Sequence, residues 1–530
     1  MTATVTPYRS DAEPGRDRFG AVLHAEWTKF RTVRSWVIGV VAAAIVTVLL
    51  GLVAASGSHT VVSAPPGAPP RPAVPTGPDG EVVNDSFYFV HQPLAGDGTI
   101  TVRVTSFTGG TITDDNSASG AAAGGTPPTV TGSIAPWAKA GLIVKANTTP
   151  GSAYAAVMVT GDHGVRMQYN YTNDLAGPTV GVSSSSPRWL RLVRAGEDII
   201  GYASADGTQW TKVGTAHLSG LGSTVQAGLF VTSPAEQIVD EHFGGGSGEM
   251  LQTEATAAFD TVDLQGQWPA GNWSNGPVGG DPTRSENGGL ESANGVFTVR
   301  GSGNIAPQTG ADSPGRLDHM LIGAFAGLIV LIVISVLFIT AEHRRGMMIR
   351  TTFSASPRRG RVLAAKAVVL GAVTFVIGLI ATVVVIPPAR HILRANGNFV
   401  LPVPFPTEVR VVVGTAALMA IAAVFAVSVG SILRRSVGAA SAAIVLIVLP
   451  YLFATAGVLP STAADWVLRI SPAAGFAIQQ VLPAYYQVDD IYTPAMGYYP
   501  LSPVAGFAVL CAWTAAAIGL AVYLQRRRDA

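Results

Sequence analysis

Six apolar stretches constrain the fold of this 530-residue chain more than any other feature. A helix that spans the hydrocarbon core of a bilayer needs about 20 mostly apolar residues. Pro450 predicts a kink or a break in the fifth stretch, because proline removes a helical hydrogen bond. The sequence therefore predicts an α-helical polytopic membrane protein with six transmembrane helices. The six stretches are Trp36–Ala55, Met320–Thr340, Val362–Ile386, Val409–Ile432, Val437–Val458 and Ser502–Leu524.

The charges of the chain separate into an acidic block and a basic remainder. Residues 57–318 hold 12 Lys/Arg and 23 Asp/Glu, and all other residues together hold 22 Lys/Arg and 10 Asp/Glu. The basic residues flank the apolar stretches, which favours contact with a lipid bilayer over contact with nucleic acid. They gather in the tail 1–35, the connection 341–361, Leu433–Ser436 and the C-terminus.

This distribution of basic residues also predicts an orientation, since Lys and Arg concentrate in the cytoplasmic segments of membrane proteins. We expect a multi-pass protein of the cytoplasmic (plasma) membrane with both termini cytoplasmic and residues 57–318 extracytoplasmic. The first helix, 36–55, is longer than the apolar core of a signal peptide. It is therefore predicted to be an uncleaved anchor, although Ala54-Ala55-Ser56 offers a weak cleavage context.

The acidic block is predicted to contain three parts. Residues 56–83 form a Pro-rich linker, residues 84–265 a series of short strands, and residues 266–318 a Gly/Asn-rich extension in which Phe297-Thr298-Val299-Arg300 is one further candidate strand. Within the second part, apolar and polar residues alternate between Gly, Asn, Asp and Pro turns, as in Leu190-Arg191-Leu192-Val193-Arg194. Many short strands without a helical pattern predict an all-β sandwich, inserted between transmembrane helices 1 and 2.

A resemblance to a known domain family supports the sandwich. The runs KAGLIVKANTTPGSAYAAVMVTGDHGVRMQY, PRWLRLVRAGEDIIGYASADGTQWTKVG and VQAGLFVTSP resemble concanavalin A-like/laminin G-type jelly-roll domains of bacterial envelope proteins. The resemblance covers residues 84–265 and implies a jelly-roll fold. It leaves an envelope glycan or protein as a candidate partner. We expect Trp189 and Tyr202 to be core residues and not a platform for stacking sugars. The run Ser204-x-Asp206-Gly207-x-x-Trp210 resembles the Asp-box turn of sialidases but is one residue short, so we expect a tight hairpin with Trp210 in the core.

Two segments on the predicted cytoplasmic side carry candidate functional residues. Residues 19–35 are predicted to form an amphipathic interfacial helix. In the connection 341–361, Glu342 lies at the end of the second apolar stretch, where a carboxylate is costly unless it is paired. Arg344 and Arg345 are its candidate partners. Met347–Phe353 is predicted to be a short helix, although a solvated basic loop is the simpler alternative.

These segments resemble the permease subunit of type-two ABC exporters of the actinobacterial kind. The carriers of the resemblance are Ala25-Glu26-Trp27-Thr28-Lys29-Phe30-Arg31 and the pattern from Glu342 to Lys366. The family implies that residues 319–530 hold helices 2–6 and that the loop 341–361 lies against a separate ATPase subunit. The interfacial-helix residues are then Glu26, Trp27, Lys29 and Arg31. The coupling residues are Glu342, Gly346, Met347, Arg350, Thr351, Pro357, Arg358 and Arg359.

Motifs for catalysis are absent from the sequence. A phosphate-binding loop needs a Gly-Lys dipeptide, and the chain has none, so ATP and Mg²⁺ are expected on the partner subunit. No HExxH, CxxC or GxSxG motif occurs, and Cys511 is the single cysteine. We therefore expect no enzyme activity and no cofactor in this chain. Asp114 and Asp115 could contribute to a calcium site, although a solvated acidic loop is the preferred interpretation.

The predicted function is that of a permease subunit of an ABC-type exporter, in a homodimer or a heterodimer of permeases. The alternative is a membrane-anchored extracytoplasmic protein that binds or senses an envelope glycan or protein, although one span would suffice for an anchor. The outer segment Ser461–Leu501 is expected either to shape an exit for the substrate or to form a structural cap. The sequence does not indicate the substrate or the direction of transport.

Overall fold

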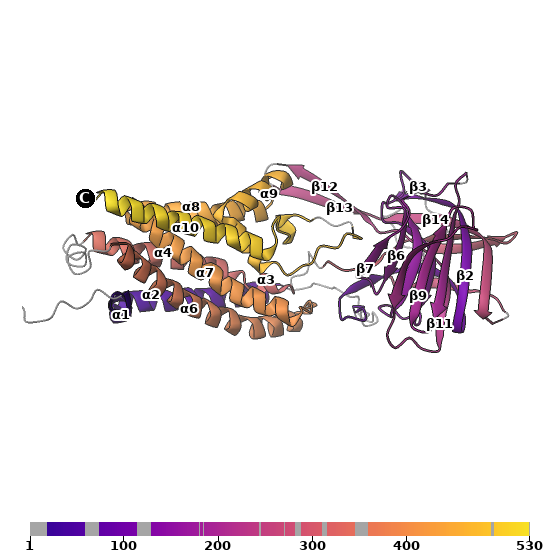
Figure 1. Ribbon diagram of the computed structural model, residues 1–530, viewed down its shortest axis with the longest axis horizontal. Coiled ribbons are helices and arrows are strands. Elements are labelled where there is room, and N and C mark those ends of the chain that lie inside the picture. The colour runs from indigo at the N-terminus through magenta and orange to yellow at the C-terminus, as the bar shows by residue number, and fades with distance from the viewer. Residues whose placement is uncertain are drawn as a thin grey trace, which may run out of the picture.

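A bundle of helices and a large β domain, which lies beyond one end of the bundle, make up the protein (Figure 1). The C-terminus lies at the other end of the bundle, which we call the distal end, and the end beside the β domain is the proximal end. The computed structural model describes residues 19–58, 74–113, 129–179, 181–183, 185–242, 245–269, 271–280, 288–309, 315–344, 359–488 and 492–528.

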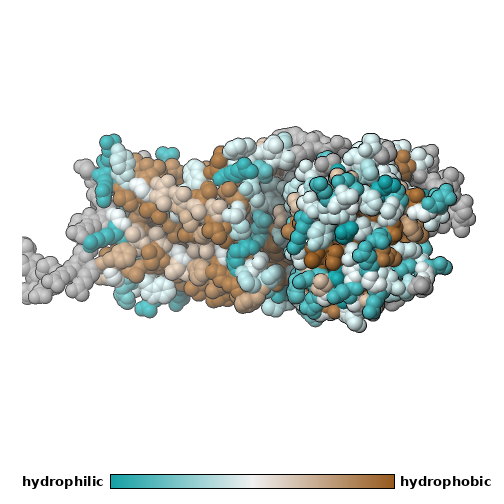
Figure 2. Space-filling model, turned by 45° about the vertical axis from the view of Figure 1, so that its right-hand side comes forward, coloured by the Kyte–Doolittle hydropathy of each residue, from teal (hydrophilic) through white to brown (hydrophobic). Residues whose placement is uncertain are grey.

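Six of the described helices are long and apolar enough to cross a membrane. The prediction of six such helices is confirmed, and Figure 2 shows hydrophobic residues over the outside of the bundle. These helices are α2 (Arg34–Gly57), α4 (Gly323–Arg344), α6 (Arg359–Ala395), α7 (Phe405–Leu433), α8 (Ser436–Thr455) and α10 (Pro503–Arg528). The shorter helices are α1 (Phe19–Thr32), α3 (Leu317–Met320), α9 (Ser461–Ile470), η1 (Pro472–Gln479) and η2 (Pro494–Met496).

Proline does not interrupt the long helices as the sequence suggested. Of the two outcomes predicted at Pro450, a kink or a break, the break is wrong, because α8 continues through Pro450 to Thr455. Likewise, α6 continues through Pro387 and Pro388 to Ala395. Proline is tolerated inside long apolar helices because neighbouring helices, hydroxyl side chains and local adjustments of the backbone can satisfy the groups that it frees.

Helices α2 and α4 approach each other closely because glycine lies at their contact. A Cβ atom placed on Gly323 would lie 2.0 Å from the Thr47 carbonyl oxygen, and one on Gly327 would lie 2.0 Å from Thr47 Oγ1. The two glycines are four residues apart and so lie on one face of α4. Small residues at this spacing allow helix backbones to pack closely in membranes. The pair thus joins the helix that precedes the β domain to the helix that follows it.

The strands described in the structure all lie between α2 and α3 in the chain, and all their pairs are antiparallel. One isolated parallel bridge, between Gly315 and Val400, lies outside these strands. They are β1 (Val83–Asp85), β2 (Phe87–Thr113), β3 (Thr129–Thr131), β4 (Lys139–Lys145), β5 (Tyr154–Thr160), β6 (Val165–Tyr169), β7 (Asn173–Ala176), β8 (Arg188–Ala195), β9 (Asp198–Ser204), β10 (Thr211–His217), β11 (Thr224–Thr232), β12 (Glu236–His242), β13 (Gly245–Leu251), β14 (Thr253–Gln267), β15 (Ser274–Val278), β16 (Gly288–Ala293), β17 (Val296–Gly301) and β18 (Ile305–Pro307).

One 14-stranded sheet dominates the β domain, with the order β10-β9-β8-β2-β11-β4-β5-β6-β7. The long strand β2 also pairs with β3, β14 and β15, so it connects the two halves of the sheet. Successive side chains of a strand point to opposite faces. Val90, Val102 and Val104 of β2 therefore face the main core of the domain, whereas Phe87 and Phe89 face a smaller core on the other side.

The β domain extends beyond residue 265, where the predicted sandwich ended. Strand β17 pairs with β14, β15 pairs with β2, and β18 pairs with β1. The predicted Gly/Asn-rich extension therefore contributes strands to the domain as far as Pro307. Because β1 and β18 pair, the chain enters and leaves the domain at adjacent strands.

The segment between α9 and α10 connects the bundle to the β domain. The Gln487 amide nitrogen donates hydrogen bonds to the carbonyl oxygens of Tyr171 (3.1 Å) and Thr172 (3.2 Å). The Tyr486 ring lies 5.7 Å from the Trp137 ring and 5.3 Å from the Arg166 guanidinium carbon. These contacts fix the β domain against the proximal end of the bundle.

Candidate functional site

Four charged side chains from three helices meet at the distal end of the bundle. We call Glu26, Lys29, Glu342 and Lys366 the distal charge cluster. Lys366 Nζ lies 2.6 Å from both Glu26 Oε2 and Glu342 Oε1. Lys29 Nζ lies 2.9 Å from Glu26 Oε1 and 3.3 Å from Glu342 Oε1. Each ammonium group therefore bridges both carboxylates, and the four charges cancel.

The amphipathic character of α1 places two of these residues in the cluster. Glu26 and Lys29 are three residues apart, so they share a face of the helix with the buried Phe30. Phe338 of α4 contacts the Phe30 ring at 6.2 Å and the Lys366 ammonium at 4.9 Å. The cluster therefore lies in largely apolar surroundings, with Glu26 and Lys366 each only 1% exposed.

Pairing among the four residues offsets the free-energy cost of burying their charges. An ion taken from water into a protein interior costs several kcal/mol unless partners compensate it. Burial by itself would lower the pKa of Lys29, but the carboxylates of Glu26 and Glu342 hold that pKa above its usual value. The cluster is thus a neutral unit, and removal of any one member leaves a buried charge. Such a unit can hold α1, α4 and α6 in one arrangement, but it offers no unpaired group for catalysis.

Three of the predicted site residues, Glu26, Lys29 and Glu342, come together in this cluster. Trp27 and Arg31 lie on the exposed side of α1, with the Trp27 ring 42% exposed and stacked on Phe30. The described partners of Glu342 are Lys366 and Lys29. The expected partners, the side chains of Arg344 and Arg345, lie outside the part of the chain that the structure describes.

The remaining predicted site residues are not described structurally. Arg359 is the first residue of α6, and nothing further is described of its side chain. The others lie outside the described residues: Gly346, Met347, Arg350, Thr351, Pro357, Arg358, Asp114 and Asp115. The described segments on either side of 345–358 are the end of α4 and the start of α6, which carry Glu342 and Lys366.

Lys366 is the member of the cluster that the sequence analysis missed as a site residue. A lysine seven residues into an apolar helix needs a partner, because a buried ammonium is as costly as a buried carboxylate. Glu342 and Lys366 are also the charged residues closest to the apolar parts of α4 and α6. Each of these two residues therefore lies at the same edge of an apolar stretch, and this was the feature of the sequence from which their pairing could have been predicted.

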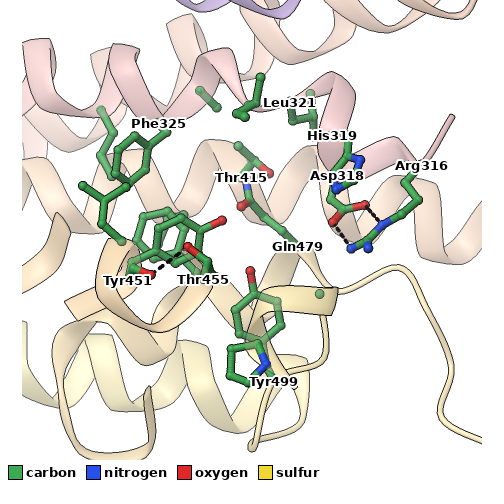
Figure 3. A pocket seen from close by; sticks show the side chains of 18 of the residues that line it. Arg316, Asp318, His319, Leu321, Phe325, Thr415, Tyr451, Thr455, Gln479 and Tyr499 are labelled. Atoms are coloured by element: carbon green, nitrogen blue, oxygen red, sulfur yellow. Dashed lines mark hydrogen bonds and ion pairs between the residues drawn. The ribbon is translucent and has the colours of Figure 1, made fainter. Parts of the chain in front are cut away.

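A cavity of about 310 Å³ lies at the proximal end of the bundle (Figure 3). Its apolar lining includes Leu321, Phe325 and Phe476. The Phe476 ring stacks on the Tyr451 ring at 4.0 Å. Helices α4, α7 and α8 and the segment between α9 and α10 all contribute to the wall, so any change in their packing would alter the volume of the cavity.

Polar groups line the other part of this cavity. Arg316, which is 2% exposed, forms a two-point ion pair with Asp318, with Nε 3.1 Å from Oδ1, and donates to the Met496 carbonyl oxygen at 2.7 Å. Burial lowers the pKa of His319, which favours the neutral imidazole there. The Gln479 amide donates to Thr415 Oγ1 at 3.0 Å. The cavity therefore suits a ligand that has both an apolar and a polar part.

The predicted core positions of three aromatic residues in the β domain are wrong. Trp189, Tyr202 and Trp210 are only half-buried. The Arg191 guanidinium carbon lies 3.9 Å from the Trp210 ring centre, and the Arg103 guanidinium carbon lies 5.7 Å from the Trp189 ring centre. In β8, the residues that face the core are instead Leu190 and Leu192.

Comparisons with known proteins do not identify the chain. No family model matches it, and no curated protein matches it. A functionally unknown protein from Saccharomyces cerevisiae is 13% identical over 35% of this chain and 76% of its own, with a TM-score of 0.19. Scytalido-glutamic peptidase with a transition state analog inhibitor is 9% identical over 41% of this chain and 98% of its own, with a TM-score of 0.25. Likenesses this weak support no argument about activity.

Proposed function

We propose that this chain is the transmembrane permease subunit of an ABC-type exporter, which moves a substrate across the cytoplasmic membrane with the help of a separate ATPase subunit. The observation that carries the proposal is the distal charge cluster. It connects the amphipathic helix α1 to α4 and α6, the two helices that flank the connection 345–358. A push on α1 or on that connection would therefore reach three helices together.

The orientation follows from the charges at the distal end. Arg434 and Arg435 lie between α7 and α8, and Arg526–Arg528 lie at the end of α10. The positive-inside rule assigns such segments to the cytoplasm. The β domain then projects beyond the outer face, and we propose that it is a jelly-roll inserted between the first and second spans. An ATPase subunit would bind at the distal end, and two permeases, identical or related, would form the complete pathway.

The proximal cavity supports a transport role, because it lies on the predicted outer side and because α4, which carries Glu342 of the cluster, also lines its wall. We propose that it is the outer part of the substrate pathway. Movement of α4 relative to α7 and α8 would widen or narrow it. The mixed lining favours an amphipathic substrate, since pockets take polar ligands only where polar groups meet them.

Co-purification tests this proposal. The full chain, solubilised in mild detergent, should retain an ABC-type ATPase subunit, and a variant that lacks residues 344–359 should lose it while it stays in the membrane. The matched control is a variant that lacks residues 114–128, a connection of similar length in the β domain, which should retain the ATPase. A full chain that carries no ATPase, or a loss of ATPase with the control deletion alone, would refute the proposed function.

A further inference from the structure

A lysine and an aspartate of the β domain form an ion pair without any exposure to solvent. Lys145 ends β4, and Asp85 ends β1. Lys145 Nζ lies 2.7 Å from Asp85 Oδ2, and both side chains are 0% exposed. The pair lies against the smaller core of the domain, which is rich in aromatic rings. The rings of that core are Phe87, Phe89, Tyr154, Tyr171 and Phe230.

The surroundings of this pair suit neutral groups better than charges. In the described part of the chain, Asp85 Oδ1 and the nearby Tyr154 hydroxyl have no hydrogen-bond partner. A buried carboxylate oxygen without a hydrogen-bond partner is costly, and the described donors to Asp85 all go to its other oxygen, Oδ2. The Lys145 ammonium has the Ser152 carbonyl oxygen (3.1 Å) and the Tyr171 hydroxyl (3.1 Å) as further neighbours. Burial lowers the pKa of Lys145, and the attraction of Asp85 does not restore it.

We propose that Lys145 and Asp85 become joined by an intramolecular isopeptide bond. The Lys145 amine attacks the carboxyl carbon of Asp85, and a C–N bond forms. One C–O bond of the carboxyl group breaks, and that oxygen leaves as water with two protons that come from the ammonium group. The product is a neutral amide, so nothing is oxidised or reduced and no further reactant is needed.

Two groups around Asp85 suit this reaction. The Tyr171 hydroxyl lies 2.8 Å from Asp85 Oδ2 and also contacts Lys145 Nζ, so it touches both reacting groups and can relay a proton between them. The Gly151 backbone N–H donates to Asp85 Oδ2 at 2.8 Å. The described donors therefore converge on Oδ2, which makes it the oxygen that receives the protons and leaves as water.

The position of the bond indicates its purpose. β1 is the first named strand after α2, and it pairs with β18, the last strand before α3. An isopeptide bond between β1 and β4 would join the first strand of the β domain to the 14-stranded sheet. Cys511 is the single cysteine of the chain, so no disulfide within the chain can do this. The domain would keep its attachment to the bundle under tension or protease attack.

Mass spectrometry of the full chain purified from membranes tests the inference. The peptide map should contain a branched peptide that joins the segments around Asp85 and Lys145 and is lighter by one water molecule than the two separate peptides. Detection of only the two linear peptides at their full mass would overturn the inference. Mapping is needed because loss of water at Asp-Gly sequences, such as Asp97-Gly98, would give the same intact mass.

Three variants test the assignment to these residues. Lys145→Arg should abolish the branched peptide, and Tyr171→Phe should lower its yield at early times after synthesis. Lys139→Arg is the matched control, because Lys139 is equally buried on the same strand but donates to the Ile305 carbonyl oxygen. It should keep the branched peptide, and a bond that persists in Lys145→Arg would refute the assignment. If Lys145→Arg does not accumulate, the map of the unaltered chain decides alone.

Discussion

Replacement of Lys366 by methionine should lower the free energy of unfolding by about 3–5 kcal/mol, because removal of one partner of a buried ion pair leaves uncompensated charge. Lys366 bridges Glu26 and Glu342, and Lys29 alone remains to neutralise both carboxylates. Because Lys29 is only half-buried, it cannot replace the lost contacts. Thermal unfolding of the full chain in detergent measures the effect.

Charge balance provides the control for this experiment. The double variant Lys366→Met, Glu342→Gln should recover part of the lost stability, since one carboxylate then faces one ammonium. Arg31→Met removes a positive charge from the exposed side of the same helix α1 and should change the melting temperature little. If Arg31→Met and Lys366→Met lowered the melting temperature equally, the loss of stability would come from the change in net charge and not from the distal charge cluster.

Replacement of Gly327 by leucine should separate α2 from α4 and prevent a stable bundle. The Cβ atom of the new side chain would lie 2.0 Å from Thr47 Oγ1 and 3.1 Å from the Ala43 carbonyl oxygen, so Thr47 must turn away, and the rest of the leucine must still displace α2. Overpacking of a tight contact typically costs about 1–3 kcal/mol of stability. The yield of monodisperse protein from membranes and its melting temperature measure the loss.

Gly519→Leu is the matched control for this variant. Gly519 lies in α10, another of the six apolar helices, and a Cβ atom there would meet no heavy atom within 4 Å among the described residues. Leucine there should therefore leave yield and melting temperature near those of the unaltered chain. If Gly327→Leu behaves like Gly519→Leu, the described contact between α2 and α4 is incorrect.

The number of long apolar helices was predictable from the sequence, because a bilayer-spanning helix requires a long apolar run, and all six runs form helices. Their ends were not predictable: α6 has 37 residues and continues well beyond the predicted Val362–Ile386. The distal charge cluster was only partly predictable. Glu342 was recognised as a carboxylate that needs a partner, but sequence proximity favoured Arg344 and Arg345. Its described partners come from α1 and α6, which lie far from it in sequence, and only the packing of three helices brings them together.

The β domain shows a different limit of prediction. The alternation of apolar and polar residues correctly identified the apolar face of β8. Trp189 was assigned to the core on a different ground, since aromatic residues are usually largely buried. In the structure, Arg103 and Arg191 cover the rings at the surface. Beyond residue 265 the sequence indicated one strand correctly, Phe297–Arg300, which lies within β17. The other strands there were missed because they are short and pair with strands distant in sequence. The ion pair of Asp85 and Lys145 gave no local signal, since 60 residues separate the two positions.

Accessibility labelling in intact cells tests the central claim, which places the β domain outside and the distal charge cluster at the cytoplasmic face. Single cysteines are introduced at Thr208, exposed in the β9–β10 turn, and at Arg435, exposed between α7 and α8, in a chain that carries Cys511→Ser. A membrane-impermeant maleimide should label the cysteine at 208 directly and the cysteine at 435 only after permeabilisation. Direct labelling at 435, or protection at 208, would contradict a permease that is driven from its distal end.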